Sequence, residues 1–455
     1  MPIKPYNDFM RKDLDYNMNL NEKQMPNLLV ITINAWSDVN STGNTISNHF
    51  GNWDKHKVSN VFLRDEEIDN DCCTRYFRIC EKDILNSLFS RKQLGVEVQQ
   101  VKENKKKLGF KTIKNTKIKE FLIRKRPMLV LLLREIFWFI GFRKKSKLDE
   151  FLNRSNPEII HIHTPTLIYG HRVLHYCHKK TRAKVVLFFG DELYDYKTYW
   201  PFDFLYQSIL RYWVRKTIKI ASINYAATPE LCDYYSSIFG KEFKVLYKGT
   251  SIVVPHSKPH PKPLKIVYAG NLLYNRWKTL ALLSKAIDQV SKNEEEFQLM
   301  IYSATPLSKE MSISLNANHS KVLGPKPFHE IKKIMQDADI VLHVESFEKK
   351  YMNVTKYSFS TKIVDCIQSG SCIMGIGPKE LASINFLTQS EAAVIANSFD
   401  EIVMQLQKII LNHILIDDYI FKMHNFTKNI FDLNLIRENI QKDLMESLLL
   451  NRENS

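Results

Sequence analysis

The sequence is poor in cysteine and lacks the spacings that give cysteine a structural role. Its seven cysteines are odd in number and include no C-x-x-C pair, which argues against a disulfide framework and a structural zinc site. The first 25 residues are polar, so we expect no signal peptide there. No run approaches the roughly 20 apolar residues of a membrane span. These absences fit a protein of the reducing cytosol.

Glycine-based nucleotide motifs are missing as well. The chain has no Walker A sequence, and GIGPKE at 375–380 lacks the third glycine of a dinucleotide fingerprint. The sequence therefore offers neither a P-loop nor a dinucleotide site of that type.

Positive charge is plentiful but confined to one segment. The formal net charge is +16. Between Val101 and Lys147 there are 16 Lys and Arg residues against three acids, or +13, so all other residues together supply +3. The excess therefore describes one local feature rather than the whole protein.

Short apolar runs alternate with helical stretches along the 455 residues. The runs are LLVITIN, PEIIHIH, KVVLFF and SINYAAT in the first half, then LKIVYAG, FQLMIYS, DIVLHVE, SCIMGIG and AAVIAN. Such alternation predicts parallel sheets built from βαβ units. Because the chain is too long for one ordinary core, we predict an α/β fold of two tandem doubly wound, Rossmann-like domains that face a cleft.

Prolines at positions 255, 259, 261 and 263 separate the two series of runs. Such a segment cannot continue a helix or a central strand, and it is typical of a stiff linker. We predict a polar extension over 1–25, a first domain over 26–248, a linker over 249–264, a second domain over 265–415 and C-terminal helices over 416–455.

The stretch YSFSTKIVDCIQSG places a lysine where a helix disfavours one. Ser358 or Ser360 is the predicted N-cap, so Lys362 follows Thr361 in the first turn, where a cation loses about 0.3–1 kcal/mol to the helix dipole. A bound phosphate would reverse that penalty, because hydroxyls and free amides would donate to it while Lys362 adds charge. Asp365, one turn further, could accept from a ribose. The alternative is an ordinary capped helix with a solvated lysine.

A second candidate, AGNLLYNRW, follows a strand of the same domain. Gly270 would let a ligand approach the backbone, and Asn271 lies beside it. Arg276 or Lys278 at the next helix start could clamp a phosphate. Glu345 ends another strand, where it could contact a sugar or cap a loop. We predict that these residues border one donor site.

The pattern S-T-K-x-x-D-x-h-x-x-G, with H-V-E-S-F before it and G-x-G-P after it, resembles the donor half of two-Rossmann-domain (GT-B) glycosyltransferases. It looks most like the family-four branch of bacterial polysaccharide assembly. The likeness covers the second domain well and the first mainly by architecture. Those enzymes usually carry a ribose-binding glutamate where Asp365 stands, and many carry another glutamate, near the sugar, where this chain has Ser358. The resemblance implies a nucleotide-diphosphate sugar as co-substrate, retention of anomeric configuration and no further cofactor.

The first domain offers acceptor-side candidates. STGN (41–44) lies between the first strand and its helix, and the resemblance implies that Gly43 approaches the donor sugar or diphosphate. A helix-capping loop is the alternative. Asp191 and Glu192 follow a strand at the carboxyl edge of the sheet, where parallel sheets bind ligands. They are our candidates for orienting or deprotonating the acceptor hydroxyl, with a solvated loop as the alternative.

No metal site is expected. His161 and His163 share one face of a strand, but zinc would need a third ligand, so packing is the favoured interpretation. We also expect the donor diphosphate to need no divalent ion, because Lys362, Arg276 and helix amides would meet its charge.

The basic segment surrounds PMLVLLLREIFWFIGF (127–142), which is apolar except for Arg134 and Glu135. It is too short to cross a bilayer, and its basic flanks favour an interfacial helix whose tryptophan and phenylalanines enter an anionic membrane. A helix buried against the first sheet, with a solvated charged loop, is an equal alternative. Nucleic acid ranks third; without an accompanying motif we expect no such partner.

These features predict a glycosyltransferase that moves a sugar from a nucleotide-diphosphate donor to a membrane-associated acceptor, either a polyprenyl-linked saccharide or an oligosaccharide. We expect it in the cytoplasm, on the inner face of the plasma membrane, in capsule or exopolysaccharide biosynthesis. The alternatives are a catalytically degenerate scaffold of the same fold and a nucleotide-sugar epimerase.

Overall fold

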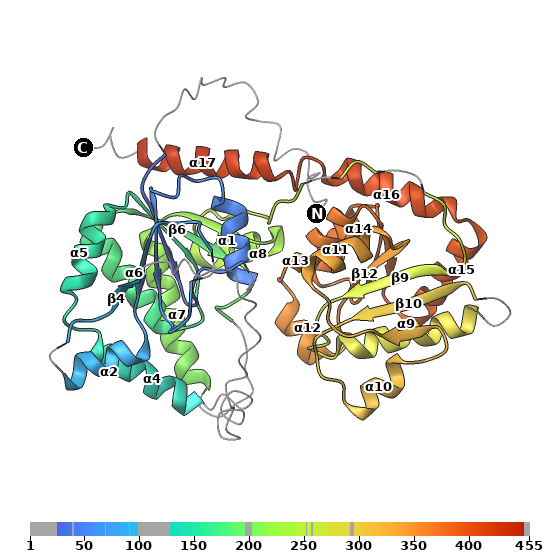
Figure 1. Ribbon diagram of the computed structural model, residues 1–455, viewed down its shortest axis with the longest axis horizontal. Coiled ribbons are helices and arrows are strands. Elements are labelled where there is room, and N and C mark those ends of the chain that lie inside the picture. The colour runs from blue at the N-terminus through green and yellow to red at the C-terminus, as the bar shows by residue number, and fades with distance from the viewer. Residues whose placement is uncertain are drawn as a thin grey trace.

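The computed structural model describes residues 25–38, 41–68, 70–90, 92–98, 128–195, 203–251, 253–255, 258–291 and 295–449. Over these residues the chain forms two α/β domains that lie beside each other, each built on one sheet (Figure 1). The predicted fold of two tandem parallel-sheet domains is thus confirmed. The predicted extension, apart from Met25, and residues 101–127 of the basic segment lie outside the described residues.

The first sheet has the strand order β4-β3-β2-β1-β5-β6-β7-β8, with only β4 antiparallel to its neighbour. Its strands are β1 (Leu28–Thr32), β2 (Val58–Phe62), β3 (Arg75–Arg78), β4 (Val96–Val98), β5 (Ile159–His163), β6 (Lys184–Phe189), β7 (Ala221–Ala226) and β8 (Lys244–Val245). Its helices are α1 (Ser41–Phe50), α2 (Glu81–Phe89), α4 (Met128–Gly141), α5 (Ser146–Ser155), α6 (Ile168–Thr181), α7 (Asp203–Ile220) and α8 (Pro229–Phe239).

The second sheet is parallel throughout, in the order β11-β10-β9-β12-β13-β14. Its strands are β9 (Leu264–Ala269), β10 (Phe297–Tyr302), β11 (Ser320–Val322), β12 (Ile340–Val344), β13 (Cys372–Ile376) and β14 (Val394–Ala396). Its helices are α9 (Arg276–Val290), α10 (Lys309–Leu315), α11 (Phe328–Gln336), α12 (Lys349–Thr355), α13 (Thr361–Ser369), α14 (Ala382–Gln389), α15 (Phe399–Leu411) and α16 (Ile414–Thr427). β9 takes the last residue of the predicted linker.

Helices cover both faces of each sheet, which explains the apolar runs. All five residues of β1 are buried. Leu28 and Val30 join one hydrophobic cluster, whereas Leu29 and Ile31 join another, because successive side chains of a strand point to opposite faces. A strand buried on both faces is apolar at every position rather than at alternate ones.

The last helix, α17 (Leu433–Leu449), returns to the first domain. It lies across that domain while α16 lies over the second (Figure 1). Asp443 on α17 accepts hydrogen bonds from the Tyr225 hydroxyl and from Lys244 Nζ, both at 2.6 Å. Arg437 Nε donates to the Asn48 carbonyl oxygen at 2.8 Å. The chain therefore joins the two domains twice.

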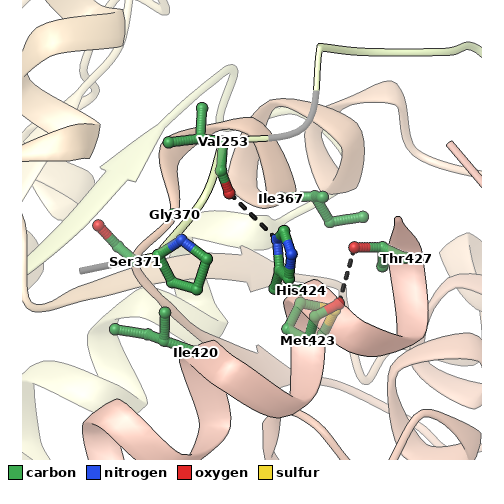
Figure 2. A pocket seen from close by; sticks show the side chains of 9 residues that line it. Val253, Ile367, Gly370, Ser371, Ile420, Met423, His424 and Thr427 are labelled. Atoms are coloured by element: carbon green, nitrogen blue, oxygen red, sulfur yellow. Dashed lines mark hydrogen bonds between the residues drawn. The ribbon is translucent and has the colours of Figure 1, made fainter. Parts of the chain in front are cut away.

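The proline-containing linker runs against the second domain. The carbonyl oxygen of Val253 lies 3.2 Å from His424 Nδ1 on α16 (Figure 2). Val253 also borders a small pocket with Ile367 and Gly370 of α13 and its end. The linker therefore packs against the C-terminal end of α13 and against α16. The start of α13 faces the first domain.

Candidate functional site

A cavity of about 1390 Å³ lies between the two domains. Its walls come from the segments after β1, β5 and β6 in the first domain, and from those after β9 and β12 and the start of α13 in the second. Single small-molecule pockets typically occupy about 300–1,000 Å³, so the cavity exceeds the needs of one ligand. The predicted site residues that line it are Gly43, Asp191, Glu192, Asn271, Arg276, Glu345, Ser358, Ser360, Thr361 and Lys362.

Helix α13 begins at the wall of this cavity. It starts after the N-cap Ser360 and ends at Gly370, whose φ of 69° favours glycine. The Ser360 side chain makes no capping hydrogen bond. The Ile363 amide donates to the Ser360 carbonyl oxygen at 2.9 Å, and the amides before it in the first turn lack the side-chain acceptor that usually covers them. The helix start therefore presents the donors that an anion site needs.

Lys362 extends from α13 toward β9 and is largely buried. Its Nζ lies 3.3 Å from the Tyr268 hydroxyl oxygen and 5.2 Å from the centre of the Tyr268 ring. A Cβ atom added at Gly270 would lie 2.1 Å from the same Nζ, so glycine leaves room for the ammonium group. Burial, and then the nearby charge of Arg276, lower the pKa of Lys362 to about 8. Lys362 keeps some exposure at the cavity wall, and its binding of a phosphate stays a prediction.

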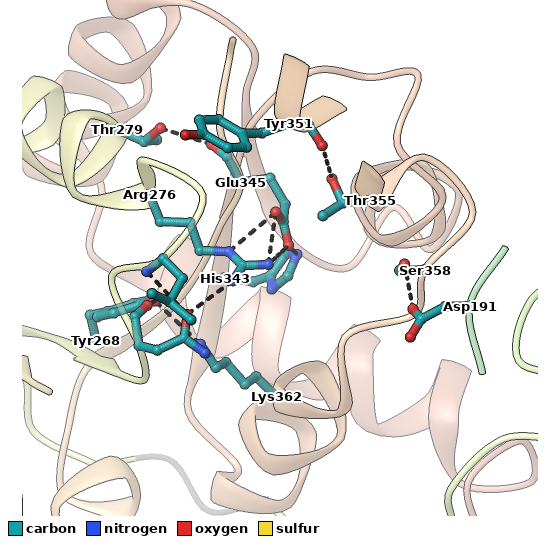
Figure 3. Close-up of polar contacts among 12 residues, drawn as sticks. Asp191, Tyr268, Arg276, Thr279, His343, Glu345, Tyr351, Thr355, Ser358 and Lys362 are labelled. Carbon is teal, nitrogen blue, oxygen red and sulfur yellow. Dashed lines mark hydrogen bonds and ion pairs between the residues drawn. The ribbon is translucent and has the colours of Figure 1, made fainter. Parts of the chain in front are cut away.

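Arg276 is already paired within the second domain. Its Nη2 contacts the two carboxylate oxygens of Glu345 at 2.9 and 3.0 Å (Figure 3), and its Nη1 donates to Asn271 Oδ1 at 3.2 Å. Beside the pair, burial lowers the pKa of His343 to about 3, which keeps that ring neutral near pH 7. The charges of Arg276 and Glu345 cancel, so Lys362 supplies the net positive charge of this cluster.

Lys278, the other residue considered as a phosphate clamp at the start of α9, lies apart from the cluster of Arg276, Glu345 and Lys362. Lys278 Nζ donates to Glu348 at 2.7 Å, and Asn275 Nδ2 donates to the same carboxylate at 2.9 Å. Between the two predicted phosphate clamps, Arg276 is the one that lines the cavity.

Asp365 does not line the cavity, although the start of its helix does. Its carboxylate lies 3.7 Å from Lys248 Nζ, and burial raises its pKa. Lys248, which follows the last strand of the first domain, does line the cavity. The ribose contact of Asp365 stays a prediction.

Gly43 lies within helix α1 rather than in a loop before it. Residues 41–44 form the first turn of α1, so the expectation of a loop there is wrong. A Cβ atom at Gly43 would lie 2.1 Å from the carbonyl oxygen of Ser37. Glycine therefore allows the preceding segment to pack on the helix, and Gly43 still borders the cavity.

Asp191 and Glu192 both border the cavity but have different partners. Asp191 Oδ1 accepts a hydrogen bond of 2.6 Å from the Ser358 hydroxyl, which links the two domains (Figure 3). Glu192 Oε1 accepts from the backbone amide of Asp195 at 2.6 Å, and burial raises the Glu192 pKa. Asp191 is thus placed beside the helix start, while Glu192 is held by its own loop. A role in proton transfer stays a prediction for both.

The two strand histidines pack in the first domain. His161 is 1% exposed, and its ring centre lies 4.8 Å from that of Phe50 and 5.5 Å from that of His163. Burial lowers the pKa of His161 to about 3. In the part of the chain that the structure describes, no group of three or more His, Cys, Asp or Glu side chains could hold a metal ion.

Helix α4, which contains most of the aromatic segment, is buried on one side and exposed on the other. Trp138 is 1% exposed and stacks on Tyr169, with ring centres 4.2 Å apart, so the expectation that this tryptophan enters a membrane is wrong. Leu133, Ile136 and Phe139 on the other side are 57%, 54% and 68% exposed. Among the described helices, none has the length and apolar character that a bilayer crossing requires.

Sequence reasoning missed three polar residues at or beside the cavity. Lys248 and Tyr268 belong to segments that otherwise look like ordinary strand ends, and Arg134 stands within an apolar run. A lysine three residues after the end of a strand, near the carboxyl edge of a parallel sheet, was the available signal for Lys248. The other two could not be placed without the packing of their neighbours.

Solved glycosyltransferases share this architecture. Anabaena HepE in complex with UDP and glucose aligns with a TM-score of 0.58 at 12% identity, over 93% of this chain and 100% of HepE. Sucrose-phosphate synthase from Thermosynechococcus elongatus aligns with a TM-score of 0.59 at 9% identity, over 93% and 99% of the two chains. The lipopolysaccharide outer core galactosyltransferase WaaB aligns with a TM-score of 0.52 at 14% identity, over 92% and 99%.

No protein-family model and no curated protein sequence matches the chain. At 9–14% identity, the likeness to these structures concerns the fold. The chain has the GT-B fold, the two-domain Rossmann-like architecture of its glycosyltransferase neighbours.

Proposed function

We propose that the protein is a glycosyltransferase whose donor is a nucleoside diphosphate sugar. The observation that carries the proposal is the start of α13 in the interdomain cavity, where uncapped amides and the buried Lys362 lie together. A diphosphate would satisfy these amides and stabilise the ammonium charge that burial disfavours. HepE, which shares the fold, has been solved with UDP and with UDP-glucose, so UDP is the first nucleotide to test.

In this proposal the second domain holds the donor. Lys362 and the α13 amides bind the diphosphate, Asp365 approaches the ribose, and Glu345 with Gly43 borders the sugar. Arg276 contributes by positioning Glu345 rather than by adding net charge. We propose that Lys248, which also lines the cavity, supplies further positive charge, so that no divalent ion is needed. As a separate proposal, based on the family resemblance, the sugar is transferred with retention.

The test is isothermal titration calorimetry with UDP and UDP-glucose, followed by product analysis. Lys362→Met should weaken UDP binding by at least about tenfold, as expected for a lost charge-assisted interaction, without unfolding the protein. Lys379→Met, a lysine outside the cavity lining, is the matched control. Absence of nucleoside diphosphate binding to the wild type would overturn the proposal. Binding without turnover would favour the degenerate scaffold, and a changed donor without any acceptor would favour the epimerase.

We also propose that the acceptor is a lipid-linked saccharide at the inner face of an anionic plasma membrane, in cell-surface polysaccharide synthesis. The supporting feature is an apolar face made by α4 with its neighbours α2 and α7, which lie at the end of the first domain opposite α17 (Figure 1). On these three helices, Leu133, Ile136 and Phe139 of α4, Phe89 of α2 and Phe204 of α7 are each more than half exposed.

Basic residues follow this face. Arg143, Lys144 and Lys147 are exposed directly after α4, and each Lys or Arg near an anionic surface contributes about 1 kcal/mol. Exposed aliphatic and aromatic side chains beside basic ones are typical of an interfacial helix. The combination favours anionic lipid over a neutral surface.

Vesicle sedimentation tests this part of the proposal separately. The full chain should sediment with vesicles of anionic lipid at low salt and less so at high salt, and only weakly with phosphatidylcholine. Replacing Leu133, Ile136 and Phe139 by Asn should abolish sedimentation. The matched control replaces Ile313 and Leu411 by Asn. These two side chains belong to the second domain and are 68% and 85% exposed. Equal binding to both lipids, or no binding, would leave α4 as an ordinary surface helix.

A further inference from the structure

The first-domain wall of the cavity contains an arginine whose donors are not satisfied. Arg134 on α4 lines the cavity, and its Nε and Nη2 atoms are buried without a hydrogen-bond partner. Nε and Nη2 are two donors of the guanidinium fork, whose planar geometry fits two oxygens of one phosphate. A buried donor without an acceptor is unfavourable, so a ligand that accepts from both atoms would be bound favourably here.

A second buried donor and a second cation lie next to it. Arg134 lies over the Tyr169 ring at 5.4 Å from its centre, and the Tyr169 hydroxyl is also buried without a partner. Arg64, exposed in the segment after β2, lines the same wall. Burial is the main cause that raises the pKa of Tyr169 to about 12; the charges of Arg134 and Arg64 lower this pKa, and those of Glu81 and Glu135 raise it. Both arginines thus lie near enough to Tyr169 to influence its hydroxyl, and both line the cavity.

The adjacent Glu135 does not neutralise Arg134 through an ion pair. Glu135 is 4% exposed, and its Oε1 accepts from the Ile168 amide at 3.1 Å and from the Tyr206 hydroxyl at 3.4 Å. These contacts hold α4 against the start of α6. Burial raises the pKa of Glu135 to about 7, which reduces its negative charge near neutral pH. Glu135 is thus held by α6 and Tyr206 rather than by the Arg134 guanidinium.

The same helix connects this wall to the apolar face. Val130 and Leu131 also line the cavity, and Val130, one turn before Arg134, is 44% exposed. An isoprenoid chain lying on the apolar face would thus meet an apolar edge and then the guanidinium of Arg134. We propose, building on the proposed function, that Arg134, with Arg64, binds the phosphate that links the acceptor saccharide to its lipid.

The probe is farnesyl diphosphate, a short isoprenoid diphosphate, titrated into the full chain by calorimetry. Saturating UDP is present throughout, so that the donor site cannot bind the probe. Arg134→Gln should weaken farnesyl diphosphate binding about tenfold to a hundredfold, the range expected for hydrogen bonds to a charged group. The affinity of Arg134→Lys for farnesyl diphosphate should lie between those of the wild type and Arg134→Gln, because lysine keeps the charge but loses the forked pair of donors. UDP affinity should be unchanged in both variants.

The controls separate the possible failures. Arg154→Gln, a surface arginine of the same domain that is 59% exposed, should bind the probe as the wild type does, and farnesol should bind much more weakly. Failure of UDP to bind would overturn the proposed function. If UDP binds normally but farnesyl diphosphate does not bind, this inference alone is overturned. The same holds if farnesyl diphosphate binds the wild type and the Arg134 variants with equal affinity. Arg134-dependent binding of glucose 1-phosphate in place of farnesyl diphosphate would overturn the lipid-linked source of the phosphate.

Discussion

The lowered pKa of Lys362 makes donor binding depend on pH in a defined direction. In the free protein the lysine is charged below about pH 8 and neutral above it. A diphosphate binds the charged form, so binding raises the lysine pKa and takes up a proton when the solution is above pH 8. UDP affinity should therefore be constant near pH 7 and fall about tenfold per pH unit above pH 8, since one proton is involved.

The magnitude has a ceiling set by the structure. If the bound diphosphate restores the pKa from about 8 to the ordinary lysine value of 10.5, the total effect is roughly 3 kcal/mol. Lys362→Met should remove the decline between pH 8 and pH 9.5 and leave a weak, flat affinity. Calorimetry with UDP at half-unit steps from pH 7 to pH 9.5 measures both. A wild-type profile that is flat above pH 8, or a decline retained in Lys362→Met, would refute the reasoning.

The same pKa has an opposite consequence for stability. Because the folded state disfavours the charged form, the unfolded state binds more protons between about pH 8 and pH 10.5. The free energy of unfolding should therefore rise with pH across that window from this group alone. In Lys362→Met this rise in the free energy of unfolding should be absent, and the variant should be at least as stable as the wild type at pH 7. Urea unfolding at pH 7 and pH 9.5 checks this, and a variant clearly less stable at pH 7 would contradict it.

Three further variants test other parts of the site and the fold. Glu345→Gln should lower the free energy of unfolding by about 3–5 kcal/mol in urea, because it leaves the buried charge of Arg276 without its partner; a loss below about 1 kcal/mol would contradict the pairing. Asp443→Asn, which weakens the contacts of α17 with the first domain, should cost about 1–3 kcal/mol and speed proteolysis around residues 428–432, whereas unchanged proteolysis would argue against a fastening role. Asp191→Asn combined with Glu192→Gln should lower kcat only a few-fold if neither acid is an essential base, and a loss above about a thousandfold would assign that role to one of them.

The sequence by itself determined the architecture and much of the second domain. The helix RWKTLALLSKAIDQV coincides with α9 and the run KVVLFF with β6, because a long periodic helix and a strand buried on both faces have distinct patterns. Short strands with mixed composition, such as β3 and β11, had no such pattern. Lys362 was identifiable because its position conflicts with the helix dipole, a local rule that needs no tertiary knowledge.

Only the tertiary structure decided which charges remain available. Arg276 and Lys362 are both cations near a helix start, yet one is cancelled by Glu345, 69 residues away along the chain, and the other is not. Trp138 and Phe139 are neighbours in one apolar run, and packing against Tyr169 buries the first while the second stays exposed. Arg134 became a candidate for ligand binding only because the tertiary structure places it in the cavity wall. Local patterns fix periodicity and caps, whereas partners brought together from distant segments fix burial, and burial sets the strength of every charge.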